Sequence, residues 1–421
     1  MIKTSDFKIK TKVMKRPNGA TKNYWPCGID IGYSSVKLFT PNRVAIFPSF
    51  AIAIDAQEIG EPSPDYIRYK NLDTGKTWLV GKAAENTISQ RDLKYNDTNL
   101  YGRDRYESEM FEVLINTALG FALEPNEYGS IGYKRLFIQT GLPSEYIQED
   151  SELLKNSFVG NHHFSLKVGN SQEKEYNITI GENQVDVMEQ PMGTLMSVIM
   201  GENHLFIPDA MDYLNKNVIV FDGGHGTLDL FLIKNNVVYE KITYRDFSMY
   251  KILSNVRDRI FEEFKQKISP IAMQKCLEDG TFYKHDKYSS KSIPFDYILS
   301  EENSKICNEA IERIASDYEL YDFDYFIVTG GTGAAWYDVI KDKLKDLEGF
   351  KIVPGNQNDP SLPFDFANSR GYYMYLYSKL KRAEKEDKGI VGKNTRWFLW
   401  KLNLNYIKLS TLTLFLYMTT E

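Results

Sequence analysis

The segment Phe221-Asp222-Gly223-Gly224-His225-Gly226-Thr227-Leu228-Asp229 decides the fold of this chain. It lies between two apolar runs, residues 218–221 and 228–233, which are typical of buried strands. Its glycines permit a tight turn whose backbone N–H groups point into an open concavity, where they can hold phosphate oxygens. A carboxylate in such a turn would repel phosphate, so its natural ligand is Mg²⁺, held mostly through waters. Alone, however, a turn of this kind is more often an ordinary hairpin.

A matching unit stands about 190 residues earlier in the chain. The stretch Gly28-Ile29-Asp30-Ile31-Gly32-Tyr33-Ser34-Ser35-Val36-Lys37 also places a carboxylate after a strand, followed by small residues and a second strand. A third segment, Val328-Thr329-Gly330-Gly331-Thr332-Gly333-Ala334-Ala335, follows a later apolar run and would let the backbone approach a flat base or a phosphate closely. Two such units in order, with a glycine-rich loop after them, favour a phosphate site over three unrelated turns.

The order of predicted elements in the first half of the chain recurs in the second half. In the first half, we predict strands within residues 28–39, 44–54, 77–81 and 136–139 and a helix at 110–122. In the second half, we predict strands at 218–221, 228–233, 237–243 and 325–328 and helices at 250–267 and about 302–319. Two polar stretches interrupt this order. Residues 276–300 are predicted to be an insertion or surface loop, and residues 384–396 are predicted to be a linker.

The length and charge of the chain restrict the class of protein. Its 421 residues exceed what one hydrophobic core usually organises, so we expect two domains or one duplicated architecture. The net charge of −6 gives no reason to expect direct nucleic-acid binding. Residues 1–24 are basic, with seven lysine or arginine residues against one aspartate, and the remainder is acidic. This segment is predicted to be either a solvated leader or an arm that contacts the neighbouring subunit of an assembly.

Cysteine usage and the C-terminal tail bear on the compartment. Cys27, Cys276 and Cys307 are far apart and odd in number, so no disulfide framework is expected, which fits a reducing cytoplasm. The N-terminus lacks the apolar core of a signal peptide. The apolar tail carries lysines and asparagines, and its longest uncharged run, residues 409–420, is little more than half of the roughly 20 residues that span a bilayer. We therefore expect a packed segment or an interaction tail and no membrane contact.

The three glycine-containing segments resemble the phosphate-1, phosphate-2 and adenosine motifs of the actin, Hsp70 and sugar-kinase superfamily. The stretch Gln139-Thr140-Gly141-Leu142-Pro143-Ser144-Glu145-Tyr146 is similar to a strand end of bacterial plasmid-segregating actins. The stretch Phe366-Ala367-Asn368-Ser369-Arg370-Gly371-Tyr372-Tyr373 is similar to the late helix that crosses back to the first domain. The resemblance covers about residues 26–382 and is nearest to the ParM group of plasmid-partition actins.

This resemblance implies an α/β fold of the duplicated actin-like (ribonuclease H-like) kind, with two domains flanking a nucleotide cleft. The expected organisation is a basic arm at 1–24, a first actin-like domain at 25–215 completed by about 366–383, a second at 216–365, a linker at 384–396 and an apolar tail at 397–421.

The resemblance also implies the residues of the site. Asp30 and Asp222 are the expected Mg²⁺ carboxylates, and Lys37 would reach a phosphate as a point charge. Glu262 and Lys265, on the predicted helix 250–267, are expected to contact the ribose or base. The remaining nucleotide contacts are expected to be Gly32, Tyr33, Ser34 and Ser35 in the first turn, Gly224, His225, Gly226 and Thr227 in the second, and Gly330, Gly331, Thr332 and Gly333 in the third segment.

Two positions depart from the pattern of the family. His225 stands where relatives carry a small residue or Asp, and it would either sense the γ-phosphate or face solvent, with solvent slightly favoured. The stretch Val185-Asp186-Val187-Met188-Glu189-Gln190-Pro191-Met192-Gly193 is similar to a Val-Met-Pro-Glu-Ser stretch whose carboxylate positions the attacking water in the ParM group. Because the proline is displaced here, Glu189 and Gln190 remain alternative catalytic residues beside Asp222.

The function that the resemblance implies is an ATPase that binds ATP, or GTP as the alternative, together with Mg²⁺. Slow hydrolysis would control a head-to-tail filament of identical subunits. The expected partners are further copies of the chain and an adaptor protein bound to centromere-like plasmid DNA, in the cytoplasm. The alternatives are a small-molecule (sugar-type) kinase of the same fold and a cell-shape or scaffold actin homologue. No convincing catalytic aspartate for a sugar is found in the sequence.

Overall fold

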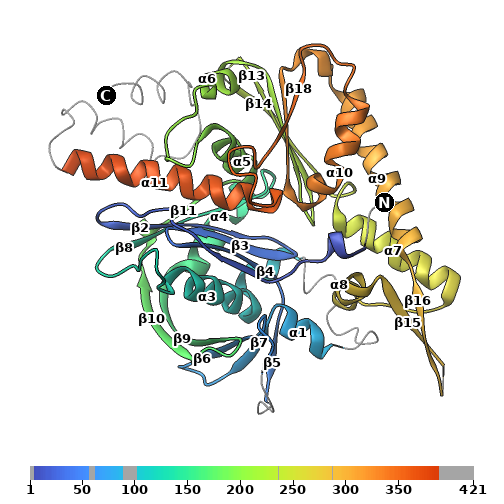
Figure 1. Cartoon of the computed structure of the whole chain (residues 1–421), viewed down its shortest axis with the longest axis horizontal. Helices are drawn as coiled ribbons and strands as arrows, with labels where there is room; N and C mark the ends of the chain where they lie inside the picture. The colour runs from blue at the N-terminus through green and yellow to red at the C-terminus, as the bar shows by residue number, and fades with distance from the viewer. Residues whose placement is uncertain (1–3, 56–61, 89–101, 236, 287, 388–421) are drawn as a thin grey trace.

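The computed structural model describes residues 4–55, 62–88, 102–235, 237–286 and 288–387, and it contains two lobes, each built around one mixed sheet (Figure 1). The first sheet has the order β1 (Lys12–Lys15), β4 (Arg43–Pro48), β3 (Ser35–Thr40), β2 (Tyr24–Ile31), β8 (Arg135–Leu142) and β11 (Val185–Glu189). The second has the order β14 (Val237–Tyr244), β13 (Leu228–Lys234), β12 (Val218–Gly223), β17 (Tyr325–Thr329) and β18 (Lys351–Pro354).

Both sheets are built in the same way. Three consecutive strands form an antiparallel meander, and the first of them pairs in parallel with a later strand, β2 with β8 and β12 with β17. A further parallel strand, β11 or β18, completes each sheet. Apart from the added edge strand β1, the two sheets therefore have the same strand order, and this confirms the predicted duplicated α/β fold. The central strand β12 is buried along its whole length, which explains why its sequence is a continuous apolar run.

Helices cover the sheets on both faces, as Figure 1 shows. In the first lobe, α3 (Glu109–Leu123) packs against β2 and β3, and α4 (Ile147–Phe158) packs against β8 and β11. In the second lobe, the buried core lies between the sheet and α7 (Met249–Phe264), α8 (Pro270–Asp279), α9 (Asp296–Asp317) and α10 (Gly330–Lys343). Between the lobes lie α5 (Gln190–Ile199) and α11 (Ala367–Asp387), whose residues join a third apolar cluster.

Each lobe carries an additional β-element. In the first lobe it is a separate sheet with the order β10 (Lys174–Ile180), β9 (Gly160–Val168), β6 (Ile67–Asn71), β7 (Thr77–Val80) and β5 (Ala51–Ile54). In the second lobe it is the hairpin of β15 (Thr281–His285) and β16 (Ser290–Pro294). The short elements are η1 (Thr4–Phe7), α1 (Lys82–Thr87), η2 (Arg103–Glu107), η3 (Glu182–Gln184), α6 (Ala210–Asn215), η4 (Leu320–Asp322) and η5 (Phe364–Phe366).

Two predicted loops are wrong, and a predicted linker differs at its start. Residues 276–300 are not a loop, because they contain the end of α8, the β15–β16 hairpin and the start of α9. The glycine-rich segment after β17 is not a loop either, since Gly330 already opens α10. The predicted linker at 384–396 begins inside α11, where the buried Glu384 accepts hydrogen bonds from Thr21 and Asn23. The rest of that linker and the tail at 397–421 lie outside the described residues.

The predicted N-terminal arm is also different in the structure. Within residues 4–24, β1 pairs along β4 as an added edge strand of the first sheet, and Phe7 of η1 is buried in the core of the second lobe. Lys8 is buried as well and forms an ion pair with Glu85. These contacts make the segment part of the folded body. The prediction failed because it relied on the basic composition, which does not reveal one buried aromatic residue and one buried ion pair.

The helices α5 and α11 cross at two glycines. A Cβ atom at Gly371 would lie 1.7 Å from the carbonyl oxygen of Gly193, so the two backbones are in direct contact. The helix α11 also touches the first sheet, because a Cβ at Gly28 of β2 would lie 2.1 Å from the carbonyl oxygen of Ser369 in α11. Glycine is required at these crossings because any side chain would force the helix away from the strand and from α5.

We expect Gly371→Ala to lower the free energy of unfolding by about 2–3 kcal/mol or more, since the added methyl group overpacks a contact that cannot relax. The measurement is denaturant unfolding followed by circular dichroism. Gly181→Ala is the matched control, because its Cβ would meet only the ends of the Gln184 and Asn183 side chains at 3.3 and 3.4 Å. Equal midpoints for the two variants would contradict this account of the crossing.

Among the described residues, none of the helices combines the length and the hydrophobicity that crossing a membrane requires.

Candidate functional site

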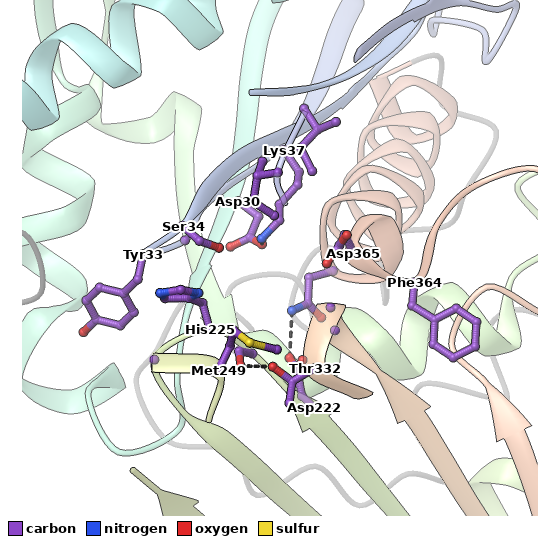
Figure 2. Close-up of a pocket in the computed structure, with 18 of the residues that line it drawn as sticks. Asp30, Tyr33, Ser34, Lys37, Asp222, His225, Met249, Thr332, Phe364 and Asp365 are labelled. Atoms are coloured by element: carbon purple, nitrogen blue, oxygen red, sulfur yellow. Dashed lines mark hydrogen bonds and ion pairs between the residues drawn. The ribbon is translucent and has the colours of Figure 1, made fainter. Parts of the chain in front are cut away.

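The turns after β2 and β12 face each other across one cavity of about 580 Å³ between the lobes. That volume is within the ordinary range for a small-molecule site. Figure 2 shows Asp30 and Lys37 on one side of this cavity and Asp222 and Thr332 on the other. Other residues of its lining are Gly32, Tyr33, Ser34, Arg105, Gln190, Gly224, His225, Gly226, Thr227, Asp229, Gly330, Gly331, Phe364, Asp365 and Asn368.

Asp30 stands at the end of β2 and is almost fully buried. Its Oδ1 accepts a hydrogen bond from Gln190 Nε2 at 3.1 Å, and its Oδ2 lies 3.3 Å from Lys37 Nζ. Burial alone would lower the pKa of Lys37, but the carboxylates of Asp30 and Asp365 outweigh it and raise that pKa. Lys37 is therefore a permanent cation at the cavity wall, as the prediction of a phosphate contact requires, and in this structure its partner is Asp30.

Asp222 occupies the equivalent place at the end of β12. Its Oδ2 accepts a hydrogen bond from Asn368 Nδ2 at 2.8 Å, and Asn368 Oδ1 accepts one from Thr194 at 2.7 Å. Burial raises the pKa of Asp222 to about 6, the hydrogen bond from Asn368 opposes this, and Asp30 adds to the increase. A buried carboxylate with a raised pKa is poised to bind a cation, because a nearby positive charge stabilises the ionised form.

A third carboxylate, Asp229, lines the same cavity and has no role in the sequence prediction. It lies directly opposite Asp222 in the β12–β13 register. Thr227 Oγ1 donates to its Oδ2 at 2.8 Å, and Thr243 donates to its Oδ1. Burial raises the pKa of Asp229 to about 7, the hydrogen bond from Thr243 opposes this, and Asp222 adds to the increase. The sequence could have identified Asp229, because it is the last residue of the turn segment 221–229.

The donor set fits Mg²⁺. Its possible ligands are carboxylate oxygens, which are the hard ligands that this ion prefers. In the part of the chain that the structure describes, no group of three or more His, Cys, Asp or Glu side chains forms a ready metal cage. Mg²⁺ usually takes one or two carboxylates, several waters and substrate phosphates. Asp30 and Asp222 are the residues that would hold it here.

The two turns touch each other through Tyr33. The space above Gly226 is filled by the Tyr33 ring, since a Cβ at Gly226 would lie 2.5 Å from Tyr33 Cδ2. Arg105 lies over the same ring at 4.7 Å from its centroid. The Arg105 guanidinium donates to the carbonyl oxygens of Ile31 and Gly32 at 3.1 Å each. Sequence reasoning missed Arg105, because it comes from η2, far from either motif.

The predicted glycine-rich segment supplies the N-terminus of α10. Gly330 has φ of +78°, and a Cβ on it would lie 2.3 Å from the carbonyl oxygen of Gly223, so only glycine fits. Thr332 Oγ1 donates to the carbonyl oxygen of Gly224 at 2.7 Å. Gly330, Gly331 and Thr332 line the cavity, where the open N–H groups of the helix favour an anion.

Two residues predicted to contact nucleotide, Gly333 and Ser35, are not among the residues that line the cavity. Gly333 packs against Gly223, whose Cβ would lie 2.6 Å from Gly333 N. Ser35 is buried at the start of β3. The lining includes Gly32, Tyr33 and Ser34 from the same turn. The structure therefore does not place Gly333 and Ser35 on the surface of the cavity.

His225, for which the sequence slightly favoured a position facing solvent, is partly buried and lines the cavity. The imidazole points into the cavity beside Tyr33 (Figure 2). Burial, together with the nearby Lys37 ammonium, lowers the pKa of His225 to about 4. The side chain is therefore a neutral hydrogen-bonding group at physiological pH.

The two candidates for positioning water are in different environments. Gln190 lines the cavity and touches Asp30. The buried Glu189 carboxylate lies outside the lining residues, 2.5 Å from Lys241 Nζ of the other lobe, and accepts from Ser144 Oγ at 3.1 Å. The geometry thus separates the alternatives that the sequence left open: Gln190 faces the cavity and Glu189 links the lobes.

Glu262 and Lys265 are not placed at the cavity. Both are exposed near the end of α7, and Lys265 Nζ donates to the Glu262 carbonyl oxygen at 3.0 Å. Of this helix, only Met249 at the opposite end lines the cavity. The helix thus turns its first residue, and not its last turn, toward the cavity, so the structure does not bring Glu262 and Lys265 together with the other predicted residues.

Two further lining residues escaped the sequence reasoning. Asp365 and Phe364 come from η5, just before α11. Asp365 packs against Gly331, where an added Cβ would lie 2.7 Å from its Oδ1. Burial raises the pKa of Asp365, although Lys37 opposes this increase. Neither residue belongs to a glycine-rich motif. They reach the cavity because η5 leads into α11, which lies between the lobes.

Comparisons with known proteins agree with this geometry. Residues 28–193 match the family described as "Actin like proteins N terminal domain". The chain is similar to a 15-stranded ParM filament from Clostridium botulinum, with a TM-score of 0.61 and 18% identity over 85% of this chain and 99% of that one. It is also similar to the actin-like protein Alp7A, with a TM-score of 0.61 and 15% identity over 87% and 99%. A third similar structure is the archaeal actin homologue Ta0583 in complex with ADP, with a TM-score of 0.55 and 16% identity over 83% and 97%. No curated protein matches the sequence at a significant level.

Residues 28–193 carry the match to the actin-like N-terminal domain, and the chain as a whole has the actin-like fold, with a cavity between its two lobes. Its structural neighbours are ParM and other bacterial and archaeal actin homologues, which confirms the resemblance predicted from the sequence.

The low pKa of His225 gives a direct test of the site electrostatics. The imidazole C–H resonance, assigned by its loss in His225→Asn, should not shift between about pH 8 and pH 5.5 and should move only near pH 4. Since the unfolded chain protonates first, acidification below the ordinary pKa of 6.5 should also weaken the fold. A midpoint near 6.5 in the folded protein would show that the ring is solvated.

Proposed function

We propose that this chain is a Mg²⁺-dependent ATPase that assembles into filaments and segregates plasmid DNA through an adaptor protein. The observation that carries the proposal is the pair of hairpin turns that bring Asp30 and Asp222, buried and from different lobes, to one cavity beside the N-terminus of α10. Such a site suits a ligand that carries both a cation and an anionic chain, as Mg-ATP does.

The phosphate-binding role is supported by the groups that the lobes contribute. Lys37 supplies a fixed positive charge, and Gly330 and Gly331 supply helix N–H groups. The bound Mg²⁺ would neutralise charge on the phosphates, and Asp30 and Asp222 would orient it. Because these groups come from both lobes, a triphosphate would hold the lobes together, and loss of its γ-phosphate would remove contacts that favour closure.

Gln190 is proposed to position the attacking water. Its amide contacts Asp30 and faces the cavity, so it can donate to and accept from a water molecule at the same time. An amide cannot remove a proton, so hydrolysis would be slow. Slow hydrolysis suits a timer that sets the lifetime of a filament.

The filament proposal is supported by the structural likeness to filament-forming actins, one of them a ParM filament and another an Alp12 filament. Identical subunits in a head-to-tail arrangement form an open helical assembly when the rotation does not close. The proposed partners are therefore further copies of the chain and, at the plasmid, an adaptor protein.

Light scattering and pelleting test the assembly. The protein with ATP and Mg²⁺ should scatter light and sediment, whereas protein with EDTA in place of Mg²⁺ should stay in the supernatant. GTP in parallel reports the base preference. Absence of assembly at all protein concentrations, in the presence of measurable ATP binding, would contradict the filament role.

Asp222→Asn tests the metal site. We expect turnover to fall about 100-fold or more, because the carboxylate that would orient Mg²⁺ is lost, while the circular dichroism spectrum stays that of the wild type. Asp338→Asn, on the exposed face of α10, is the control and should keep its turnover within about twofold. Unchanged turnover in Asp222→Asn would remove this residue from the site.

Gln190→Ala and Glu189→Gln separate the two candidate residues. We expect Gln190→Ala to slow single-turnover hydrolysis about 10- to 100-fold with little change in nucleotide affinity. Glu189→Gln keeps the size of the side chain and should change hydrolysis by less than about threefold, since its carboxylate serves a contact between the lobes. The reverse pattern would assign the water to Glu189.

A further inference from the structure

The N-terminal strap, residues 4–15, spans the two lobes. Its second half is β1, which pairs with β4 from Lys12 opposite Ile46 to Lys15 opposite Arg43. Its first half is η1, which contacts α8 and α10 of the second lobe. In Figure 1, this dark blue segment runs from the first sheet toward α7 and α10. The strap is thus attached to a different lobe at each end.

Two consecutive residues anchor the strap on opposite sides. Phe7 is 7% exposed and joins the hydrophobic core of the second lobe. Lys8 forms an ion pair with Glu85 of α1 in the first lobe, and the two side chains are only 1% and 4% exposed. A charge pair this deeply buried is costly to break, because separation would leave each charge without its partner in a low-dielectric site. Rotation of one lobe away from the other therefore has to detach one of the two anchors.

The lobes also touch each other beside these anchors. Ile271 of α8 is buried in a cluster with Phe50, Leu79 and Ala84 of the first lobe. Lys82 Nζ of α1 lies 3.0 Å from Glu278 Oε1 of α8. The strap is therefore one part of a closed mouth, where apolar and ionic contacts from both lobes meet.

The strap also lines the cavity of the site. Residues 5–10 and Lys12 all belong to its wall. Among the described residues, five lysines and arginines belong to that wall: Lys8, Lys10 and Lys12 come from the strap, and the others are Lys37 and Arg105. A ligand with several negative charges would therefore be enclosed by a segment that carries much of the positive charge around it.

We propose that the N-terminal strap forms a third wall of the nucleotide cavity and acts as a latch that limits nucleotide release. This proposal rests on the proposed nucleotide binding. A nucleotide held by both lobes can leave only when they separate, and separation requires Phe7 or Lys8 to leave its pocket. The strap would thereby set how long a subunit keeps its nucleotide.

Release of a fluorescent ATP analogue (mant-ATP) tests the latch. The full-length protein is loaded with mant-ATP and Mg²⁺ and mixed with excess ATP in a stopped-flow instrument. We expect Phe7→Ala and the double variant Lys8→Met/Glu85→Gln to release the probe roughly tenfold faster or more, which corresponds to the loss of one well-buried contact. The double variant removes both charges so that neither is left buried alone.

Lys15→Met is the matched control. Lys15 belongs to the same strap and also forms an ion pair, with Glu127 at 3.2 Å, but its side chain is 58% exposed and does not line the cavity. Release from this variant should stay within about twofold of the wild type. If the double variant does not fold, as judged by circular dichroism, Phe7→Ala against Lys15→Met decides the same question.

The outcomes separate the two proposals. Failure of the wild type to bind mant-ATP or ATP overturns the proposed nucleotide function. Binding by the wild type, with release unchanged in folded Phe7→Ala and Lys8→Met/Glu85→Gln, overturns the latch and leaves the nucleotide function in place. Faster release in Lys15→Met to the same extent as in the other variants also overturns it, because the effect would not depend on the anchors at the cavity.

Discussion

The whole arrangement depends on a backbone contact between two helices. At Gly193 and Gly371, α5 and α11 approach so closely that no side chain could stand between them. Because α11 also lies directly against Gly28 of β2, the helix is fixed to the first sheet and to the element that follows β11. From this position it extends Asn368 to Asp222 of the second lobe. Small residues at a crossing thus determine where two carboxylates from different sheets meet.

Burial of like charges is the second constraint. Asp222 and Asp229 are paired across one hairpin, and Asp30 and Asp365 approach from the first lobe and from η5. Such a group of carboxylates opposes closure unless cations enter or protons are shared. Lys37 compensates part of this charge, and the pKa values of Asp222 and Asp229 are raised mainly by burial and further by a neighbouring carboxylate. A closed cleft and a bound cation are therefore mutually stabilising in the proposed function.

The sequence predicted features that depend on neighbouring residues, and it missed those that depend on residues far apart in the chain. The two hairpin turns were predictable, because Asp and Gly at fixed spacing determine a turn locally. Asn368 and Asp365 reach the site through the return of the chain between the lobes, which no local pattern encodes. The hairpin β15–β16 was mistaken for a loop because most of its residues are exposed, so apolar and polar positions do not alternate. Lys8 looked solvated because its partner is 77 residues away.

The closed mouth and the crossing of α5 with α11 lie on different parts of the boundary between the lobes, and they differ in kind. The crossing is a contact of backbones, with no side chain that could change rotamer and release it. At the mouth, side chains hold the lobes together: an aromatic ring, a buried ion pair and one aliphatic residue. Side-chain contacts can separate and re-form without a change of fold, whereas the glycine crossing cannot open without displacing a helix. If the lobes move, the crossing therefore serves as the pivot and the mouth as the part that opens, and the cavity between them is where a ligand can bias that motion.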